Sequence, residues 1–200
     1  MSMNFYLDDP LWLASQFFAF WALIFSVWAW QVKNKIKLMF LVGMFSMFLA
    51  VSASFLSNWS LGALFGLAAI RNYVFCYIDW RISKGRYVAQ WVPYAFAGVF
   101  AICTIIATAL LWHTGMALWL ELLICLTLLG LIYGNIQKGT DLMRVSFIFN
   151  RLFNIINHIY FNNVIAVIIA VLAISSNIVF YIRQYIAWKK ERKDVQTENE

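Results

Sequence analysis

The chain has 200 residues, of which 64% are hydrophobic and only 12% are charged, and its net charge is +6. A soluble domain carries about 25% charged residues, so a chain of this composition cannot cover itself with polar surface in water, and a soluble globular protein is excluded. The three cysteines stand singly in apolar runs beside only two histidines, so neither a disulfide framework nor a metal site is predicted.

Apolar runs of about 17 to 25 residues follow one another along the chain, each long enough to cross a bilayer. We expect seven transmembrane helices, at about 11–31, 38–56, 61–79, 90–111, 117–136, 142–160 and 164–187. Residues 1–10 contain no Lys or Arg, so a cleavable signal peptide is not expected. The predicted fold is one all-α integral membrane domain over residues 1–188, followed by a basic, polar tail at 189–200.

Basic residues lie only in alternate breaks between the predicted spans. These residues are Lys33, Lys35 and Lys37 in the first break, Arg81, Lys84 and Arg86 in the third, Lys138 in the fifth, and Lys189, Lys190, Arg192 and Lys193 in the tail. Because Lys and Arg near span ends stay cytoplasmic, the N-terminus is predicted outside and the C-terminus inside. The same rule and attraction to anionic lipids explain the basic charge more simply than nucleic acid does, so no nucleic-acid partner is expected.

The sixth predicted span is the most polar one. Its Leu, Ile and Phe content argues against a soluble loop, and omitting it would place the basic tail outside. Five polar residues occupy one helical stripe, since a turn takes 3.6 residues: Asn150, Arg151, Asn154, Asn157 and His158. This stripe lines either a wet cavity or a seam of hydrogen bonds between helices.

A repeat relates the first three predicted spans to the last three. Residues 67–75, LAAIRNYVF, align with residues 172–180, LAISSNIVF, so that Asn72 meets Asn177, and Gln31 meets Gln137 at nearly the same offset. Two parallel three-helix units, at about 11–79 and 117–187, would be joined by a linker helix at about 90–111. A pseudo-twofold axis along the membrane normal would bring the two asparagines face to face.

Several segments are similar to the YgjV-type bacterial inner membrane proteins, over most of residues 12–187. They are SVWAWQVKNKIKLMF, SLGALFGLAAIRNYVF and LMRVSFIFNRLFNIINHIYF, followed by SSNIVFYIRQ. This resemblance implies a multi-pass protein of the bacterial plasma membrane and defines no substrate.

The 3+1+3 arrangement also resembles the SWEET sugar transporters and their PQ-loop relatives. That resemblance implies that Asn72 and Asn177 match a pair of asparagines lining the family's sugar pocket. Gln31 and Gln137 match only half of that family's Pro-Gln hinge motif, because Trp30 precedes the first glutamine and an isoleucine precedes the second. The tryptophans that line the pocket in that family are also poorly matched in this chain, which weakens the case for a sugar substrate.

Two arginines, Arg71 and Arg151, lie near the middle of predicted spans without a matching acid. A charge at mid-bilayer costs about 2.5 to 3.5 kcal/mol on insertion scales, so each should face protein or water. They favour an anionic or carboxylate-bearing solute, and pairing with backbone carbonyls or snorkelling is an equal alternative. The predicted solute-binding residues are Arg71, Asn72, Asn150, Arg151, Asn154, Asn157, His158 and Asn177, with Gln31 and Gln137 as hinge candidates.

The predicted function is that of a facilitator which moves a small polar solute by alternating access, within the lipid bilayer and without catalytic residues, metal or cofactor. The sequence leaves open a homo-oligomer. A non-transporting receptor or scaffold is the first alternative. A membrane enzyme that uses Arg71, Arg151, His158 and Glu121 is the second.

Overall fold

The computed structural model describes residues 9–111, 118–136 and 141–198. Within these residues all regular structure is helical, which confirms the predicted all-α class. The helices are α1 (Pro10–Gln31), α2 (Lys35–Phe55), α3 (Trp59–Ser83), α4 (Trp91–Leu111), α5 (Leu118–Ile136), α6 (Asp141–Tyr160) and α7 (Val164–Glu198). Except at the end of α7, their bounds differ from the predicted spans by no more than four residues.

Polar caps fix where the first three helices begin. The Asp9 side chain accepts a hydrogen bond from the backbone N–H of Leu11 at 2.9 Å, and Pro10 occupies the first turn of α1. Asn34 and Asn58 cap α2 and α3 in the same way. Because these side chains satisfy N–H groups that a helix leaves free, the chain can turn sharply between antiparallel helices.

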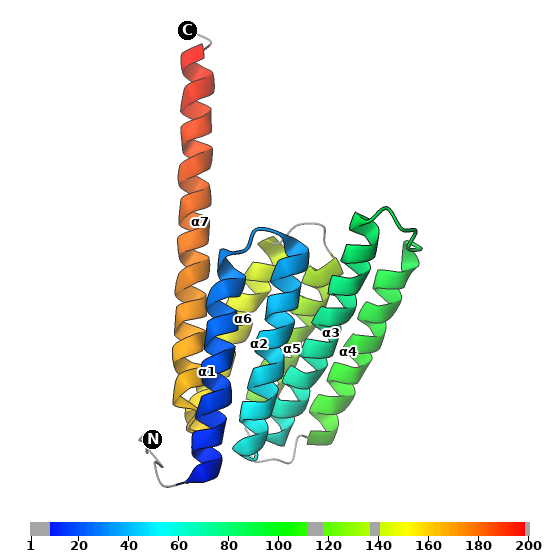
Figure 1. Cartoon of the computed structure of the whole chain (residues 1–200), viewed down its shortest axis with the longest axis vertical. Coiled ribbons are helices and arrows are strands. Elements are labelled where there is room, and N and C mark those ends of the chain that lie inside the picture. Colours follow the sequence, from blue (N-terminus) through cyan, green and yellow to red (C-terminus); the bar gives the residue numbers. More distant parts are fainter. Residues whose placement is uncertain (1–8, 112–117, 137–140, 199–200) are drawn as a thin grey trace.

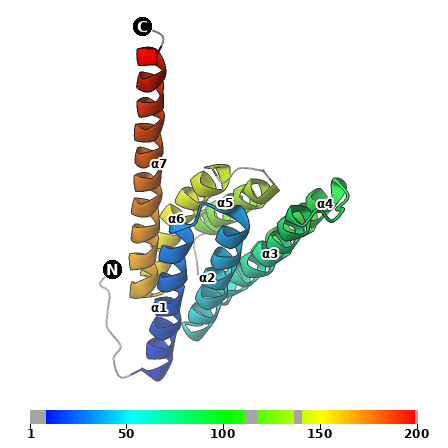
Figure 2. The same ribbon diagram turned by 45° about the horizontal axis from the view of Figure 1, so that its top comes forward.

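Successive helices run in alternate directions and pack against their neighbours in the chain (Figure 1). Helix α7 also packs against α1 and so joins the two ends of the row, while α3 touches α5. In Figure 2, α3 and α4 incline away from α1 and α7. The connections α1–α2 and α3–α4 lie together at one end of the bundle, which we call the basic end because Lys35 and Arg81 lie there. Helix α7 runs far beyond this end, through the predicted polar tail.

Five of the helices are long and apolar enough to cross a membrane: α1, α2, α3, α4 and α7. The prediction of membrane spans is therefore confirmed for these five. Helices α5 and α6 are not among them, and the orientation of the termini and the 3+1+3 arrangement stay predictions.

Helix α6 has the reverse distribution of a soluble amphipathic helix. Its exposed side includes Val145, Phe149, Leu152, Ile156 and Ile159, which follow one another at intervals of three or four residues. Arg144, Asn150, Arg151 and Asn154 are buried and face the interior. An apolar outer face and a polar inner face suit a helix that has lipid on one side and a polar interior on the other.

Candidate solute-binding site

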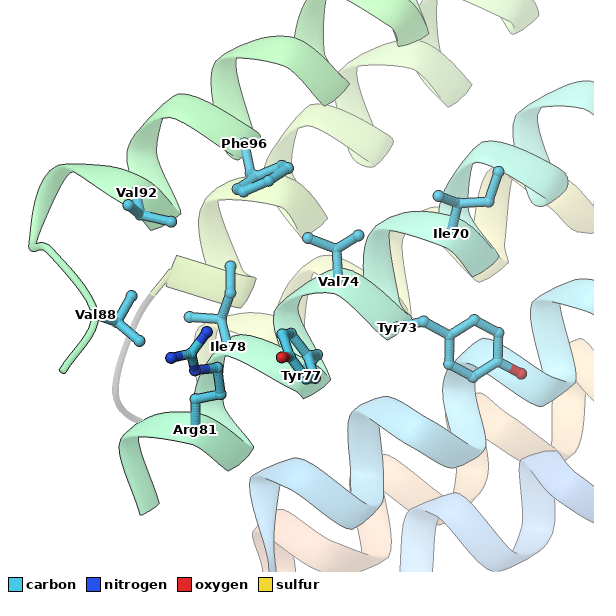
Figure 3. Close-up of a pocket in the computed structure, with 9 residues that line it drawn as sticks. All are labelled: Ile70, Tyr73, Val74, Tyr77, Ile78, Arg81, Val88, Val92 and Phe96. Atoms are coloured by element: carbon cyan, nitrogen blue, oxygen red, sulfur yellow. The ribbon is translucent and has the colours of Figure 1, made fainter. Parts of the chain in front are cut away.

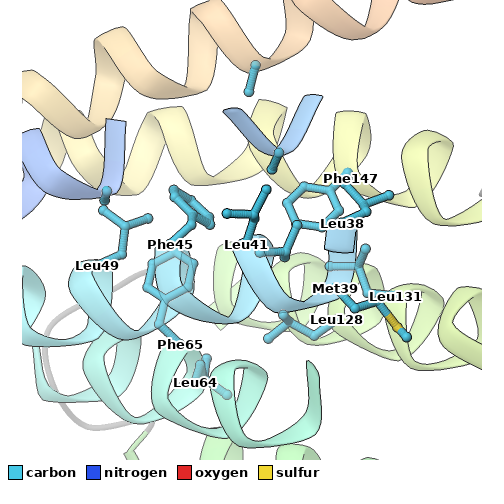
Figure 4. Close-up of a cluster of buried hydrophobic side chains, with 14 of the residues drawn as sticks. Leu38, Met39, Leu41, Phe45, Leu49, Leu64, Phe65, Leu128, Leu131 and Phe147 are labelled. Atoms are coloured by element: carbon cyan, nitrogen blue, oxygen red, sulfur yellow. The ribbon is translucent and has the colours of Figure 1, made fainter. Parts of the chain in front are cut away.

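A small cavity lies at the centre of the bundle, between α2 and α3 on one side and α5 and α6 on the other. Its volume of about 10 Å³ leaves room for roughly one water molecule. The lining consists of Phe45, Ser46, Phe65, Ala68, Arg71, Leu128, Leu131, Phe147, Asn150 and Arg151. Figure 4 shows its aromatic and leucine side chains within the buried hydrophobic cluster. Both predicted mid-membrane arginines therefore reach the same cavity.

Arg71 of α3 is 3% exposed and is held by neutral oxygen atoms. Its Nη1 donates to the backbone carbonyl of Leu128 on α5 at 3.4 Å. Its Nε and Nη2 donate to Asn72 Oδ1 at 3.4 and 3.2 Å. Pairing with a backbone carbonyl, one of the two predicted alternatives, is thus realised for this arginine.

Arg151 of α6 is 1% exposed, and aromatic rings hold its guanidinium group. The guanidinium carbon lies 4.0 Å from the ring centre of Phe45 and 5.4 Å from that of Phe147. Its Nε and Nη1 atoms are buried and have no hydrogen-bond partner in the described part of the chain. Among the described residues neither this arginine nor Arg71 forms an ion pair, so two cationic groups line the cavity without a protein counter-ion.

The two asparagines expected to face each other do not form a pair. Asn72 Oδ1 accepts a hydrogen bond from Nδ2 of Asn135 on α5 at 3.2 Å. Asn177 is buried on α7, and its Nδ2 donates to the carbonyl of Ala173 in the same helix at 2.8 Å. Helices α3 and α7 are not among the pairs that pack closely. The structure therefore brings Asn72 to α5 rather than to Asn177.

The polar stripe of α6 is turned inward, as the spacing predicts. Asn150, Arg151, Asn154 and His158 are each no more than 2% exposed. Asn154 Nδ2 donates to the carbonyl and Oδ1 of Asn150 at 2.7 and 3.0 Å. The His158 ring stacks on Phe65 with 6.3 Å between ring centres, and its Nε2 has no hydrogen-bond partner. The side chain of Asn157 lies outside the part that the structure describes.

Polar contacts continue from the cavity to the basic end. Nζ of Lys35 lies 2.9 Å from Oδ2 of Asp79 and donates to the backbone carbonyl of Asn135 at 2.9 Å. The ion pair joins α2 to α3, and the bond to Asn135 joins α2 to α5. The thiol of Cys76, one turn from Asp79, donates to the carbonyl of Ile36 at 3.4 Å. At this end Lys35 is therefore the residue that connects α2 and α3 with α5.

At the opposite end the polar contacts are between uncharged groups. Ser15 and Ser52 hydroxyls lie 3.0 Å apart, and Asn163 Nδ2 donates to the Ser52 hydroxyl at 3.0 Å. The Gln16 side chain accepts from the backbone N–H of Ile165 at 3.2 Å. These bonds tie α1 and α2 to the start of α7, so polar contacts join helices at both ends of the bundle.

Two buried polar residues outside the cavity lining were not predicted from the sequence. Asn135 stands alone in an apolar run, and only its place near the end of that run hints at a partner. Arg144 is 1% exposed, lies 4.0 Å from the ring centre of Phe180, and donates to the carbonyl of Val32 at 3.3 Å. Of the hinge candidates, Gln31 is an exposed residue at the end of α1, and Gln137 lies outside the described residues.

A larger hollow of about 550 Å³ opens between α3 and α4 (Figure 3). Its lining is Ile70, Tyr73, Val74, Tyr77, Ile78, Arg81, Val88, Val92 and Phe96. Apart from Arg81 and the tyrosine hydroxyls, this surface is apolar. It suits lipid acyl chains better than a polar solute, so the small central cavity remains the candidate site.

Apolar helices whose outward faces carry large hydrophobic side chains, around a buried set of asparagines and arginines, define a polytopic α-helical membrane protein. The model of the Imp-YgjV family, described as bacterial inner membrane proteins, matches residues 13–187. The chain belongs to this family, which confirms the first resemblance and the location in the bacterial inner membrane. Comparison with curated proteins and with solved structures gave no match.

Proposed function

We propose that this protein is a facilitator that carries a small polar solute across the bacterial inner membrane by alternating access. The observation that carries the proposal is the buried polar interior around Arg71 and Arg151, which lies between α2–α3 and α5–α6. A site between two helical units suits a protein that opens to one side at a time.

The main alternative is that the polar residues only hold helices together. Such a role is fulfilled when each buried polar atom finds a partner in the protein. Several atoms here do not, including Asn72 Nδ2, Arg151 Nε and His158 Nε2. In a dry interior an unpaired polar group is costly, so these atoms favour a solute or water as their partner.

In the proposed cycle the structure corresponds to the occluded state. Two units at about residues 11–79 and 117–187 rock against each other, with the N-terminus outside. Opening the basic end separates Lys35 from the carbonyl of Asn135, whereas the Lys35–Asp79 ion pair stays within the first unit. Opening the other end separates Ser52 from Asn163. No bond is made or broken, so the proposed protein is a carrier and not an enzyme.

The test is solute uptake into proteoliposomes that contain the purified full chain. Labelled sugars, carboxylates, amino acids and nucleosides are assayed in turn, with protein-free vesicles as the baseline. We expect saturable uptake of one class and counterflow when the vesicles are preloaded with it. A folded, correctly inserted protein that exchanges none of these solutes would overturn the proposal and favour a receptor or scaffold.

A further inference from the structure

We infer that the transported solute carries an oxyanion group, and that Arg151 is its principal ligand in the central cavity. This inference rests on the proposed function, because it assigns a substrate class to the same site. The charged side chains that line the cavity are Arg71 and Arg151, and both are cationic.

The electrostatics of an empty cavity favour an anion. Both guanidinium groups are at least 97% buried, and neither has a carboxylate partner in the described chain. Like charges repel strongly in a low-dielectric interior, and an unpaired buried charge loses its hydration without compensation. A bound anion would offset both costs and a cation would add to them, whereas a neutral sugar would accept hydrogen bonds but leave the repulsion between the two charges in place.

The two arginines differ in how many of their hydrogen-bond donors are available to a ligand. The contacts of Arg71 with Leu128 and Asn72 already engage all three of its guanidinium nitrogens. Arg151 keeps two nitrogens without a partner, while Phe45 and Phe147 hold its position. A guanidinium group placed against aromatic rings loses little freedom when it binds a carboxylate or phosphate. Arg151 is therefore the direct ligand, and Arg71 supplies a second positive charge.

The oxyanion group has two sources, an organic carboxylate or an inorganic oxyanion such as phosphate. The cavity holds about 10 Å³, so either one needs the helices to move apart slightly. Asn150 lines the same cavity and adds a neutral amide. An organic carboxylate carries a carbon skeleton that an inorganic oxyanion lacks, so an experiment that compares the two kinds of anion can tell them apart.

The test measures thermal unfolding of the full chain in detergent against acetate, succinate, phosphate and sulfate at constant ionic strength. Chloride serves as the salt reference, and glucose serves as the neutral solute. A ligand that binds the folded state raises the unfolding temperature. We expect either the carboxylates or the inorganic oxyanions to raise the unfolding temperature of the wild type. The kind of anion that does so is the kind that the site binds.

Matched variants assign the site. Arg151→Met should weaken the apparent affinity for the stabilising anion at least tenfold, and Arg71→Met should weaken it less. Arg144→Met is the control, because it also removes a buried arginine packed on an aromatic ring but lies outside the cavity lining. If Arg151→Met does not fold, Arg151→Lys replaces it and should retain weakened binding. Equal anion affinity in the folded Arg151 variant and the Arg144 variant would overturn the inference.

Failure of this inference differs from failure of transport. If glucose alone stabilises the wild type and is taken up by proteoliposomes, the anion inference is wrong while the carrier function stands. If an anion binds through Arg151 but no solute is exchanged, the anion site stands and the carrier function is wrong.

Discussion

Breaking the ion pair at the basic end should open that end of the bundle. The change is Lys35→Met, which keeps the length of the side chain but removes its charge. Two contacts are lost, each 2.9 Å long: the one to Asp79 and the one to the carbonyl of Asn135. The first joins α2 to α3 and the second joins α2 to α5, so their loss should weaken the packing of these three helices at the basic end.

The magnitude follows from the partial burial of the pair. The two side chains are 16% and 24% exposed, so the pair is screened less than a surface pair but is not dry. An exposed pair contributes about 0.2 to 1 kcal/mol, and a hydrogen bond from a charged group about 1.5 to 3 kcal/mol. A combined loss of about 2 kcal/mol corresponds to a roughly 30-fold larger open population.

Cys76 provides a native reporter for this opening. It is partly buried one turn from Asp79, and its thiol is bonded to the α2 carbonyl of Ile36. In a background with Cys103→Ala and Cys125→Ala, maleimide labelling reports only this thiol. When opening is fast, the labelling rate follows the open population, so Lys35→Met should label up to about 30-fold faster.

Lys37→Met is the control, since it removes an exposed lysine from the same turn of α2, and this lysine forms no ion pair within the part of the chain that the structure describes. Asp79→Asn should accelerate labelling as Lys35→Met does, and the double variant should not add the two effects, because both remove one interaction. Equal labelling rates in Lys35→Met and Lys37→Met would refute the role of Lys35 in holding the basic end together.

Three further predictions concern packing, the central asparagine and orientation. A Cβ added at Gly43 would lie 2.8 Å from the Tyr73 ring, whereas one added at Gly66 would meet nothing within 4 Å. Gly43→Ala should therefore lower the free energy of unfolding by about 1 to 3 kcal/mol. Gly66→Ala should leave it unchanged or raise it, as measured by unfolding in detergent. Asn72→Ala removes the hydrogen bonds from Asn135 and the neighbouring arginine and should cost about 1 to 2 kcal/mol. Asn177→Ala, which loses only a bond within α7, should cost less in the same assay, and the reverse order would contradict the pairing in the structure. A fluorescent protein that folds only in the cytoplasm, fused to the C-terminus, should fluoresce in cells; a dark but full-length fusion would contradict the predicted orientation.

The sequence was most informative where one physical effect dominates. Apolar runs of bilayer length predicted where each helix lies, because burial of apolar side chains decides helix position in a membrane. The period of 3.6 residues predicted that Asn150, Arg151, Asn154 and His158 share the inner face of α6. The continuation of α7 to Glu198 follows from Lys, Glu, Arg and Gln residues, which are good helix formers even without a core to pack on.

The sequence was least informative about which helices meet. The repeat suggested that Asn72 faces Asn177, but a shared sequence pattern does not determine the order of helices around the bundle. The structure places Asn135 beside Asn72 instead. A single asparagine in an apolar run gives no sign of its partner, because the partner depends on tilt and rotation. Hydropathy alone also does not identify α6 as a span, since its polar face lowers the average over the whole helix.

The buried arginines are stronger evidence for a binding function than the buried apolar cluster is. Apolar residues of similar volume commonly replace buried charges without loss of stability, and sometimes with a gain. A bundle that needed only to hold together would therefore not require two guanidinium groups at its centre that lack an ion pair in the described chain. The guanidinium nitrogens of Arg71 donate to Leu128 of α5 and to Asn72. Two nitrogens of Arg151 have no hydrogen-bond partner in the described chain, and its guanidinium group lies against the ring of Phe45. Because a membrane interior makes such free donors expensive, their presence favours a ligand that the bundle binds and releases.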